Sequence, residues 1–157
     1  VMKESMMVAK TVAWSILGKT NNTKQISKKW KKYGATGLHI HCPDGSTRKD
    51  GPSAGGAITT CILSALTGIP IKHSIAMTGE INLEGTITEI GGLEEKVSGA
   101  IRSGVRLVLY PRENENDAKE IRESFPSWFE GDFDMRPVDT IHDILKIVLV
   151  KPITYDM

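Results

Sequence analysis

The amino-acid sequence predicts an α/β domain in which helices pack on a mixed β-sheet. In the second half of the chain, segments with apolar residues at helical spacing alternate with short apolar runs typical of strands. The 157 residues are 39% hydrophobic and 25% charged, which suits one domain with a single core. We therefore expect parallel or mixed strand pairing beneath covering helices.

The N-terminal third is expected to hold one helix, a loop and a strand. Met2–Leu17 places apolar side chains close to helical spacing, and Gly18 suits the end of that helix. The polar stretch Lys19–Ala35 is interpreted as a loop. Leu38–Cys42 alternates between apolar and polar residues, which predicts a strand, and Pro43–Ser46 predicts a turn.

The middle of the chain predicts a buried helix followed by strands. Ala54–Leu66 is almost wholly apolar or small, with Gly68 and a proline just beyond its end. Ser74–Met77 predicts the start of a strand. Ile81–Ile90 alternates in polarity and is expected to form a hairpin with its neighbour.

The C-terminal part alternates between helix and strand. We expect helices at Leu93–Ser103, Glu115–Glu123 and Ile141–Val150, a central strand at Val105–Tyr110, and an edge strand at Phe133–Val138 that tolerates Pro137. Asp139 and Thr140 are expected to cap the last helix.

Charge and cysteine content limit the possible settings. The net charge of +1 gives no electrostatic reason to expect a nucleic acid or a membrane as partner, and the lysine-rich stretch Lys24–Lys32 is interpreted as a solvated loop or helix face. Cys42 and Cys61 make no disulfide framework, and Cys61 is expected in the core. Because no secretory signal or long apolar run is present, we expect the cytoplasm or the mitochondrial matrix.

Ser53 is a candidate nucleophile because it stands at the start of the apolar helix. The free N–H groups and positive dipole end of a helix can stabilise an oxyanion that forms beside the serine. Gly55 and Gly56 are expected to let a peptide backbone approach closely. The plainer alternative is that Ser53 only caps the helix.

Two other motif interpretations of this segment are weaker. The pattern Gly51-x-Ser53-x-Gly55 also occurs in the nucleophile elbow of α/β-hydrolases, but a polar loop precedes it here instead of an apolar strand. Asp139 and His142 follow Ser53 in the order of a catalytic triad, but nothing in the sequence indicates that they reach it. A phosphate-binding loop is excluded because the required lysine and hydroxyl are missing after Gly56.

Lys96 is the candidate base because no histidine is well placed to activate Ser53. It stands in the first turns of its predicted helix, at the edge of an apolar stripe formed by Leu93, Val97 and Ala100. A lysine acts as a base only when its ammonium group loses the proton, so we expect Lys96 to be sheltered from water. The alternative is a surface lysine paired with a neighbouring glutamate.

Three segments resemble the proteolytic domain of Lon, the ATP-dependent protease with a serine–lysine dyad. They are Asp50–Gly55 (DGPSAG), Thr78–Glu80 (TGE) and Gly91–Lys96 (GGLEEK). The resemblance covers about residues 1–150, although Gly56 stands where a larger apolar residue is usual. It implies a fold of the Lon proteolytic-domain type, with Ser53 as nucleophile, Lys96 as general base and Thr78 close to both. It also implies that Asp50 takes part in switching between open and blocked sites.

The same resemblance implies how the chain works in a larger protein. Residues 1–157 would form a single proteolytic domain, truncated at its N-terminus, with the ATPase module absent from this chain. The expected substrates are unfolded or damaged proteins, and the expected assembly is a homohexamer that needs no nucleic acid for catalysis. No cofactor is expected in this domain, since ATP and Mg²⁺ would serve the ATPase module.

Two alternatives remain open at this point. A serine–histidine–aspartate esterase would use His142, and a non-catalytic α/β assembly or binding domain would keep the fold without the chemistry. His39 and His41 share one face of their predicted strand, which suggests zinc, but a third ligand is not apparent. We expect no metal there.

Overall fold

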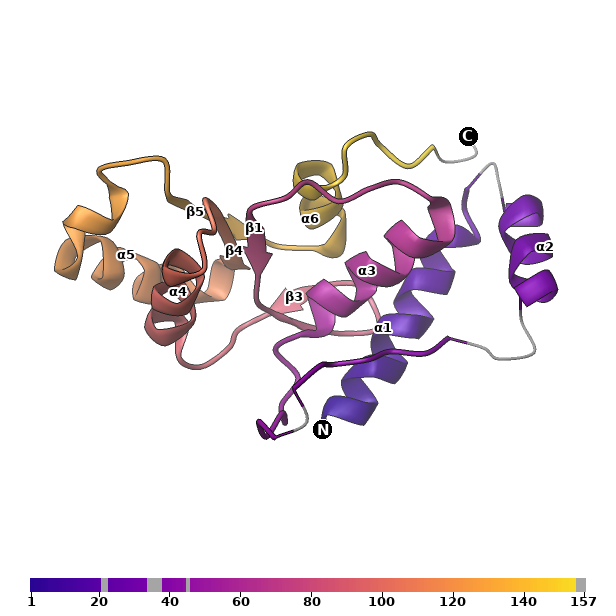
Figure 1. Cartoon of the computed structure of the whole chain (residues 1–157), viewed down its shortest axis with the longest axis horizontal. Helices are drawn as coiled ribbons and strands as arrows, with labels where there is room; N and C mark the ends of the chain where they lie inside the picture. The colour runs from indigo at the N-terminus through magenta and orange to yellow at the C-terminus, as the bar shows by residue number, and fades with distance from the viewer. Residues whose placement is uncertain (21–22, 34–37, 45, 155–157) are drawn as a thin grey trace.

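The computed structural model describes residues 1–20, 23–33, 38–44 and 46–154, and it is a mixed α/β fold (Figure 1). Helices α1 (Met2–Leu17), α3 (Gly55–Thr67) and α6 (Ile141–Val148) form one part of the molecule. A three-stranded sheet with helices α4 (Leu93–Arg102) and α5 (Glu115–Ser124) forms the other.

Helices α1 and α3 lie side by side because each has an apolar face, and α6 packs against α3. Leu17, Leu63 and Val148, one from each helix, are completely buried in the same core cluster. Helix α3 ends where Gly68 adopts a left-handed conformation with φ of 72°, which glycine reaches without steric cost. The predictions for Met2–Leu17 and Ala54–Leu66 are confirmed to within one residue.

The main sheet is parallel throughout, with strand order β1 (Ile75–Met77), β4 (Leu107–Pro111) and β5 (Asp134–Val138). Strand β4 is central and almost entirely buried, and β5 is an edge strand that contains Pro137, as predicted. A second core cluster, which includes Val97 of α4 and Tyr110 of β4, joins this sheet to its helices. The carboxyl ends of β1 and β4 therefore open on the same edge of the sheet.

A short antiparallel hairpin of β2 (Glu80–Ile81) and β3 (Ile87–Thr88) follows β1. The segment Ile81–Ile90 thus folds back on itself, instead of pairing as one long strand. Short 3₁₀ helices occupy Arg112–Asn114 and Pro126–Phe129.

Helix α6 begins with a capping box, which confirms the predicted cap. Thr140 accepts a hydrogen bond from the backbone N–H of Asp143, and the Asp143 carboxylate accepts one from the N–H of Thr140. Burial opposes ionisation of Asp143, but the N–H groups of Asp139 and Thr140 outweigh this effect and lower the pKa of Asp143.

Three predictions for the first 61 residues are wrong. The predicted loop Lys19–Ala35 contains helix α2 (Thr23–Tyr33), which docks through the buried Ile26. Within the described residues, Leu38–Cys42 belongs to no strand, because packing of the half-buried Leu38 and Ile40 against the core already accounts for its alternation. Cys61 is exposed, since it faces away from the buried side of α3.

None of the helices in the described part of the chain is long and apolar enough to cross a membrane.

Candidate functional site

Ser53 lies in the turn that leads into α3 and is half-buried. Its carbonyl oxygen accepts a hydrogen bond from the N–H of Gly79 at 2.8 Å, and the N–H of Gly56 donates to the Gly79 carbonyl at 3.2 Å. These two bonds attach the start of α3 to the chain that leaves β1. The N-cap of α3 is Ala54, so the Ser53 hydroxyl is not the helix cap.

Gly55 and Gly56 do not serve the purpose that the sequence suggested. Both are buried, and a Cβ at Gly55 would lie 2.8 Å from Ile81 Cγ2. A Cβ at Gly56 would lie 3.3 Å from Ile144 Cδ1. The two glycines therefore allow the core to approach α3, instead of a substrate backbone.

The N–H groups at the start of α3 differ in their availability. Those of Gly55 and Gly56 donate to the Pro52 and Gly79 carbonyls. Within the described ranges, the N–H groups of Ser53 and Ala54 have no hydrogen-bond acceptor. These two are consequently the donors that an oxyanion beside Ser53 could use.

Thr78 follows directly on β1 and has 8% of its surface exposed. Its backbone N–H donates to the Leu109 carbonyl at 3.0 Å, which holds it at the carboxyl end of the parallel sheet. Its hydroxyl oxygen is buried and has no hydrogen-bond partner among the described residues. A buried hydroxyl without a partner is costly, so it marks a position where an incoming polar group would be stabilised.

Lys96 lies in the first turns of α4, beside the face that buries Leu93 and Val97. The helix begins at Gly92, whose φ of 69° turns the chain sharply into it. The Lys96 side chain is exposed, so the expected shelter from water is wrong for this chain taken alone. The stripe formed by Leu93 and Val97 orients α4 and leaves Lys96 at its border.

A cavity of about 250 Å³ brings Ser53, Thr78 and Lys96 together, although they are far apart in the sequence. The rest of its wall is apolar: Ala54, Ala57, Ala76, Met77, Ala100 and Val108. In the part of the chain that the structure describes, no hydrogen bond joins the Ser53 and Lys96 side chains. Sequence reasoning missed these wall residues: most lie near site residues on α3, β1 and α4, and Val108 comes from β4, which carries no predicted site residue.

Other predicted polar residues lie elsewhere. Asp50 is exposed and accepts a hydrogen bond from the Gly51 N–H at 2.9 Å, outside the cavity. Asp139 pairs with the Arg112 side chain at 2.9 Å, and neither Asp139 nor His142 lines the cavity. The triad needed by an esterase is therefore not assembled around Ser53.

The described residues contain no group of three side chains able to hold a metal ion. His39 and His41 are exposed, with ring centroids 6.4 Å apart.

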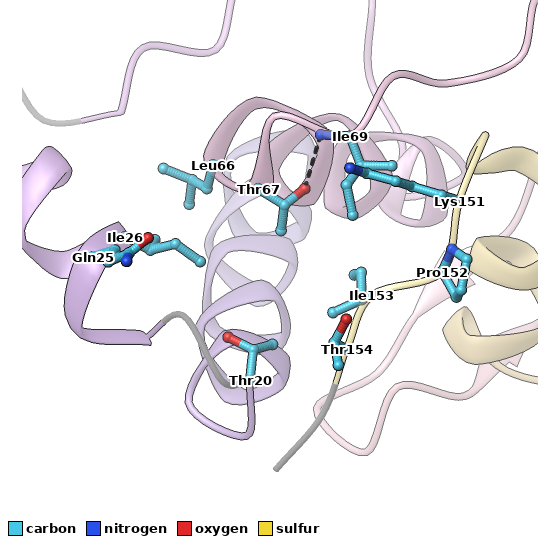
Figure 2. Close-up of a pocket in the computed structure, with 10 residues that line it drawn as sticks. All are labelled: Thr20, Gln25, Ile26, Leu66, Thr67, Ile69, Lys151, Pro152, Ile153 and Thr154. Carbon is cyan, nitrogen blue, oxygen red and sulfur yellow. Dashed lines mark hydrogen bonds between the residues drawn. The ribbon is translucent and has the colours of Figure 1, made fainter.

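A second cavity of about 340 Å³ lies between α2, the end of α3 and the C-terminal segment (Figure 2). The Thr67 hydroxyl accepts a hydrogen bond from the Ile69 N–H at its rim, and Ile26 and Ile153 form part of its wall. None of the predicted site residues lines this cavity.

The chain is similar to proteases from several bacteria. The sequence model of the Lon protease (S16) C-terminal proteolytic domain matches residues 1–151. The Lon protease of Vibrio parahaemolyticus is 42% identical over 151 residues, which is 96% of this chain and 18% of that protein. The Lon protease of Buchnera aphidicola (strain Bp) is 45% identical over 149 residues, covering 95% of this chain and 18% of that protein. The chain thus spans 18% of the length of these relatives.

Proposed function

Because the chain belongs to the family of Lon protease (S16) C-terminal proteolytic domains, we propose that it hydrolyses peptide bonds with a Ser53–Lys96 dyad. The observation that carries this proposal is the shared cavity, which Ser53, Thr78 and Lys96 line from three different elements. A nucleophile, a base and a hydrogen-bonding hydroxyl around one hollow are the parts that acyl transfer needs.

The proposed reaction runs in two halves. Neutral Lys96 takes the proton from Ser53 while Oγ attacks the peptide carbonyl carbon. The tetrahedral intermediate collapses when protonated Lys96 donates to the leaving amine, which leaves an ester on Ser53. Water then loses a proton to Lys96 and attacks the ester, so that the carboxylic acid leaves and Ser53 is regenerated.

Backbone and threonine groups complete this site. The unoccupied N–H groups of Ser53 and Ala54 are proposed to hold the oxyanion, at roughly 2.7–4 kcal/mol of transition-state stabilisation for one such donor. The unpaired Thr78 hydroxyl is proposed to accept a hydrogen bond from the Lys96 amine and align it with Ser53. Asp50 lies outside the cavity, so we assign it no chemical step.

The exposure of Lys96 places a condition on the mechanism. A lysine surrounded by water keeps its proton, so the neutral amine requires that water be excluded. We propose that a substrate chain lying across the cavity supplies this cover. The apolar wall formed by Met77, Val108 and four alanines favours an apolar substrate side chain in that place.

The biological setting is proposed from the names of the relatives. Each is a Lon protease, and we propose that this chain serves unfolded or damaged proteins within a homohexamer. The proposed chemistry uses no cofactor at Ser53 or Lys96, and ATP with Mg²⁺ would act at an ATPase module.

A fluorophosphonate probe that modifies activated serines tests the dyad. We expect labelling of the native chain at Ser53, and its loss in Ser53→Ala and in Lys96→Ala. Ser103→Ala, at an exposed serine just after α4, is the matched control and should keep full labelling.

Two results would contradict this proposal. Labelling of Ser53 that survives in Lys96→Ala but disappears in His142→Ala would favour the esterase. Absence of labelling in well-folded native protein supplied with unfolded substrate would favour a non-catalytic binding domain.

A further inference from the structure

Helix α2 presents a basic face that no acidic residue of the same helix balances. It contains five lysines and no aspartate or glutamate. Lys24, Lys28 and Lys31 follow one another along a single stripe, which spans about 10 Å at 1.5 Å per residue. With Thr23 and Ser27 they line a shallow hollow of about 420 Å³.

Among the described residues, no acidic side chain forms an ion pair with this stripe. Lys24, Lys28 and Lys31 are exposed, and they take part in none of the ion pairs found in the described ranges. Helix α2 is held from the opposite side by the buried Ile26. Its lysine face therefore points away from the body of the molecule.

An acidic cleft of about 240 Å³ lies between α4 and α5. Glu94, Glu95, Asp117 and Glu120 line it, and all four are exposed. Asp117 accepts a hydrogen bond from the Asn114 side-chain amide at 2.7 Å, but no described ion pair involves any of the four carboxylates. The cleft is thus negatively charged and open to solvent.

The basic face and the acidic cleft lie at opposite ends of the long axis of the molecule (Figure 1). They cannot meet within one copy, although they would be complementary across two. We propose that the lysine stripe of α2 in one copy docks into the α4–α5 cleft of the next copy. This inference rests on the self-assembly proposed above and names the surfaces that carry it.

The two surfaces match in form as well as in charge. The cleft has a volume of about 240 Å³, and lysine side chains can extend their charged ends toward its carboxylates from a flexible stem. The hollow between the lysines, floored by Thr23 and Ser27, leaves room for the ridge of the partner helix. Because the two faces differ, the contact is heterologous and leaves one face of each kind open, so further copies can add and the assembly becomes a ring where the rotation between copies closes.

A second copy accounts for these surfaces better than a nucleic acid does. The net charge of the chain is only +1, and the acidic cleft would repel a phosphate backbone. A second copy uses both surfaces at once, and it leaves neither charge cluster unmatched.

Charge reversal in pairs tests the proposed contact. Variant A carries Lys24→Glu and Lys28→Glu, and variant B carries Glu94→Lys, Glu95→Lys and Glu120→Lys, which leaves Asp117 as the one acidic residue lining the cleft. Alone, each should sediment as a monomer, because its two faces have the same sign. An equimolar mixture of A and B should associate again through the native stripe of B and the native cleft of A, and a chain that carries all five changes should associate through its reversed charges. Lys10→Glu with Lys72→Glu makes the same charge change at exposed lysines elsewhere and should associate like the native chain.

The native assembly should also weaken with salt. Exposed ion pairs are screened once the Debye length falls to a few ångströms, so we expect the association constant to fall at least about tenfold from 0.05 M to 0.5 M NaCl. Circular dichroism of every variant checks that the helices remain folded.

The inference is overturned if the native chain is monomeric at low salt, if either variant associates alone, or if the mixture stays monomeric. Fluorophosphonate labelling in the same samples separates this result from the proposed chemistry. Failed labelling in a chain that assembles counts against the dyad alone. Normal labelling in a chain that shows no charge-swap rescue counts against the contact alone.

Discussion

The two helix starts that carry the candidate dyad are built differently. The start of α3 is attached to the chain after β1 by two backbone hydrogen bonds, and its glycines are packed against isoleucines of the core. The start of α4 turns at the exposed Gly92, and Lys96 on its first turns lines the cavity while remaining exposed to solvent. The fold thus holds Ser53 firmly, whereas the dry environment that the proposed role of Lys96 requires would have to be completed from outside.

The two residues of the proposed dyad therefore have different requirements, and the chain meets only that of Ser53. Positioning of a nucleophile depends on packing, which a single domain can supply. A neutral lysine depends on the absence of water, which the cavity alone does not provide. The comparison therefore predicts that changes near Ser53 affect stability and activity together, and that changes at Lys96 affect activity alone.

The largest expected effect is at Lys96. Lys96→Ala should lower the rate of Ser53 labelling about 10²–10⁴-fold, the usual contribution of a general base. The free energy of unfolding should stay within about 0.5 kcal/mol of the native value, because the side chain is exposed. The rate is measured by stopping the fluorophosphonate reaction at a series of times, and the free energy of unfolding is measured by urea unfolding.

Lys96→Arg makes this prediction specific to proton transfer. Arginine keeps the charge and the helix propensity but does not give up its proton, so labelling should fall as far as in the alanine variant. Retained labelling in Lys96→Arg would show that only the positive charge matters.

The next effect concerns Gly79, where a Cβ would collide with Ile87 Cγ2. Gly79→Ala should lower the free energy of unfolding by roughly 1–3 kcal/mol, the usual cost of overpacking, and should also lower Ser53 labelling. Gly99→Ala in α4 is the matched control, because a Cβ there meets only Arg102 Nη2 at 4.0 Å. The control should gain up to about 1 kcal/mol from helix propensity.

One result would contradict the difference between the two helix starts. If Gly79→Ala unfolds at the same urea concentration as the native chain, the packing beneath Ser53 is looser than the structure indicates.

At Thr78, we expect a substitution that lowers activity while stability stays the same or rises. Thr78→Val removes a buried hydroxyl that has no partner among the described residues, so stability should stay the same or rise by up to about 1 kcal/mol. Labelling should fall about tenfold because Lys96 loses its alignment. Thr78→Ser should keep most of the labelling, and equal rates in the serine and valine variants would exclude a role for the hydroxyl.

The smallest expected effect is at the third helix start, which has a side-chain cap. The lowered pKa of Asp143 means that its stabilising contribution is complete above the ordinary value of 3.8 and is lost as the pH falls below it. Asp143→Ala should lower the free energy of unfolding by about 1 kcal/mol at pH 7 and by less near pH 3. Urea unfolding at both values checks this, with Asp132→Ala in an exposed loop as the control. A difference that is the same at both pH values would contradict the capping box.

Much of this fold was predictable because its periodic segments have a single buried face. The helices α1, α3 and α6 and the parallel strands β4 and β5 follow directly from that pattern. Helix α2 escaped prediction because five lysines conceal an apolar face on which Ile26 is buried. At Leu38–Cys42, a strand was predicted that the structure does not contain. Alternation in polarity shows which side chains are buried, but it does not show that a partner strand exists.

Part of the candidate site was also predictable from the sequence, and part was not. Ser53, Thr78 and Lys96 could be named from resemblance, and the structure places them around one cavity. The apolar wall could not be predicted, because Ala57, Ala76 and Val108 become neighbours only when α3, β1 and β4 pack. The exposure of Lys96 was missed because a helical stripe orients the helix without showing what covers its border.

A crystal structure of the chain with a peptide boronate bound tests the central claim most directly. The account predicts boron bonded to Ser53 Oγ, with Lys96 Nζ at roughly 2.6–3.2 Å from that oxygen and covered by the peptide. A boronate on Ser53 with Lys96 still extended into solvent would contradict it.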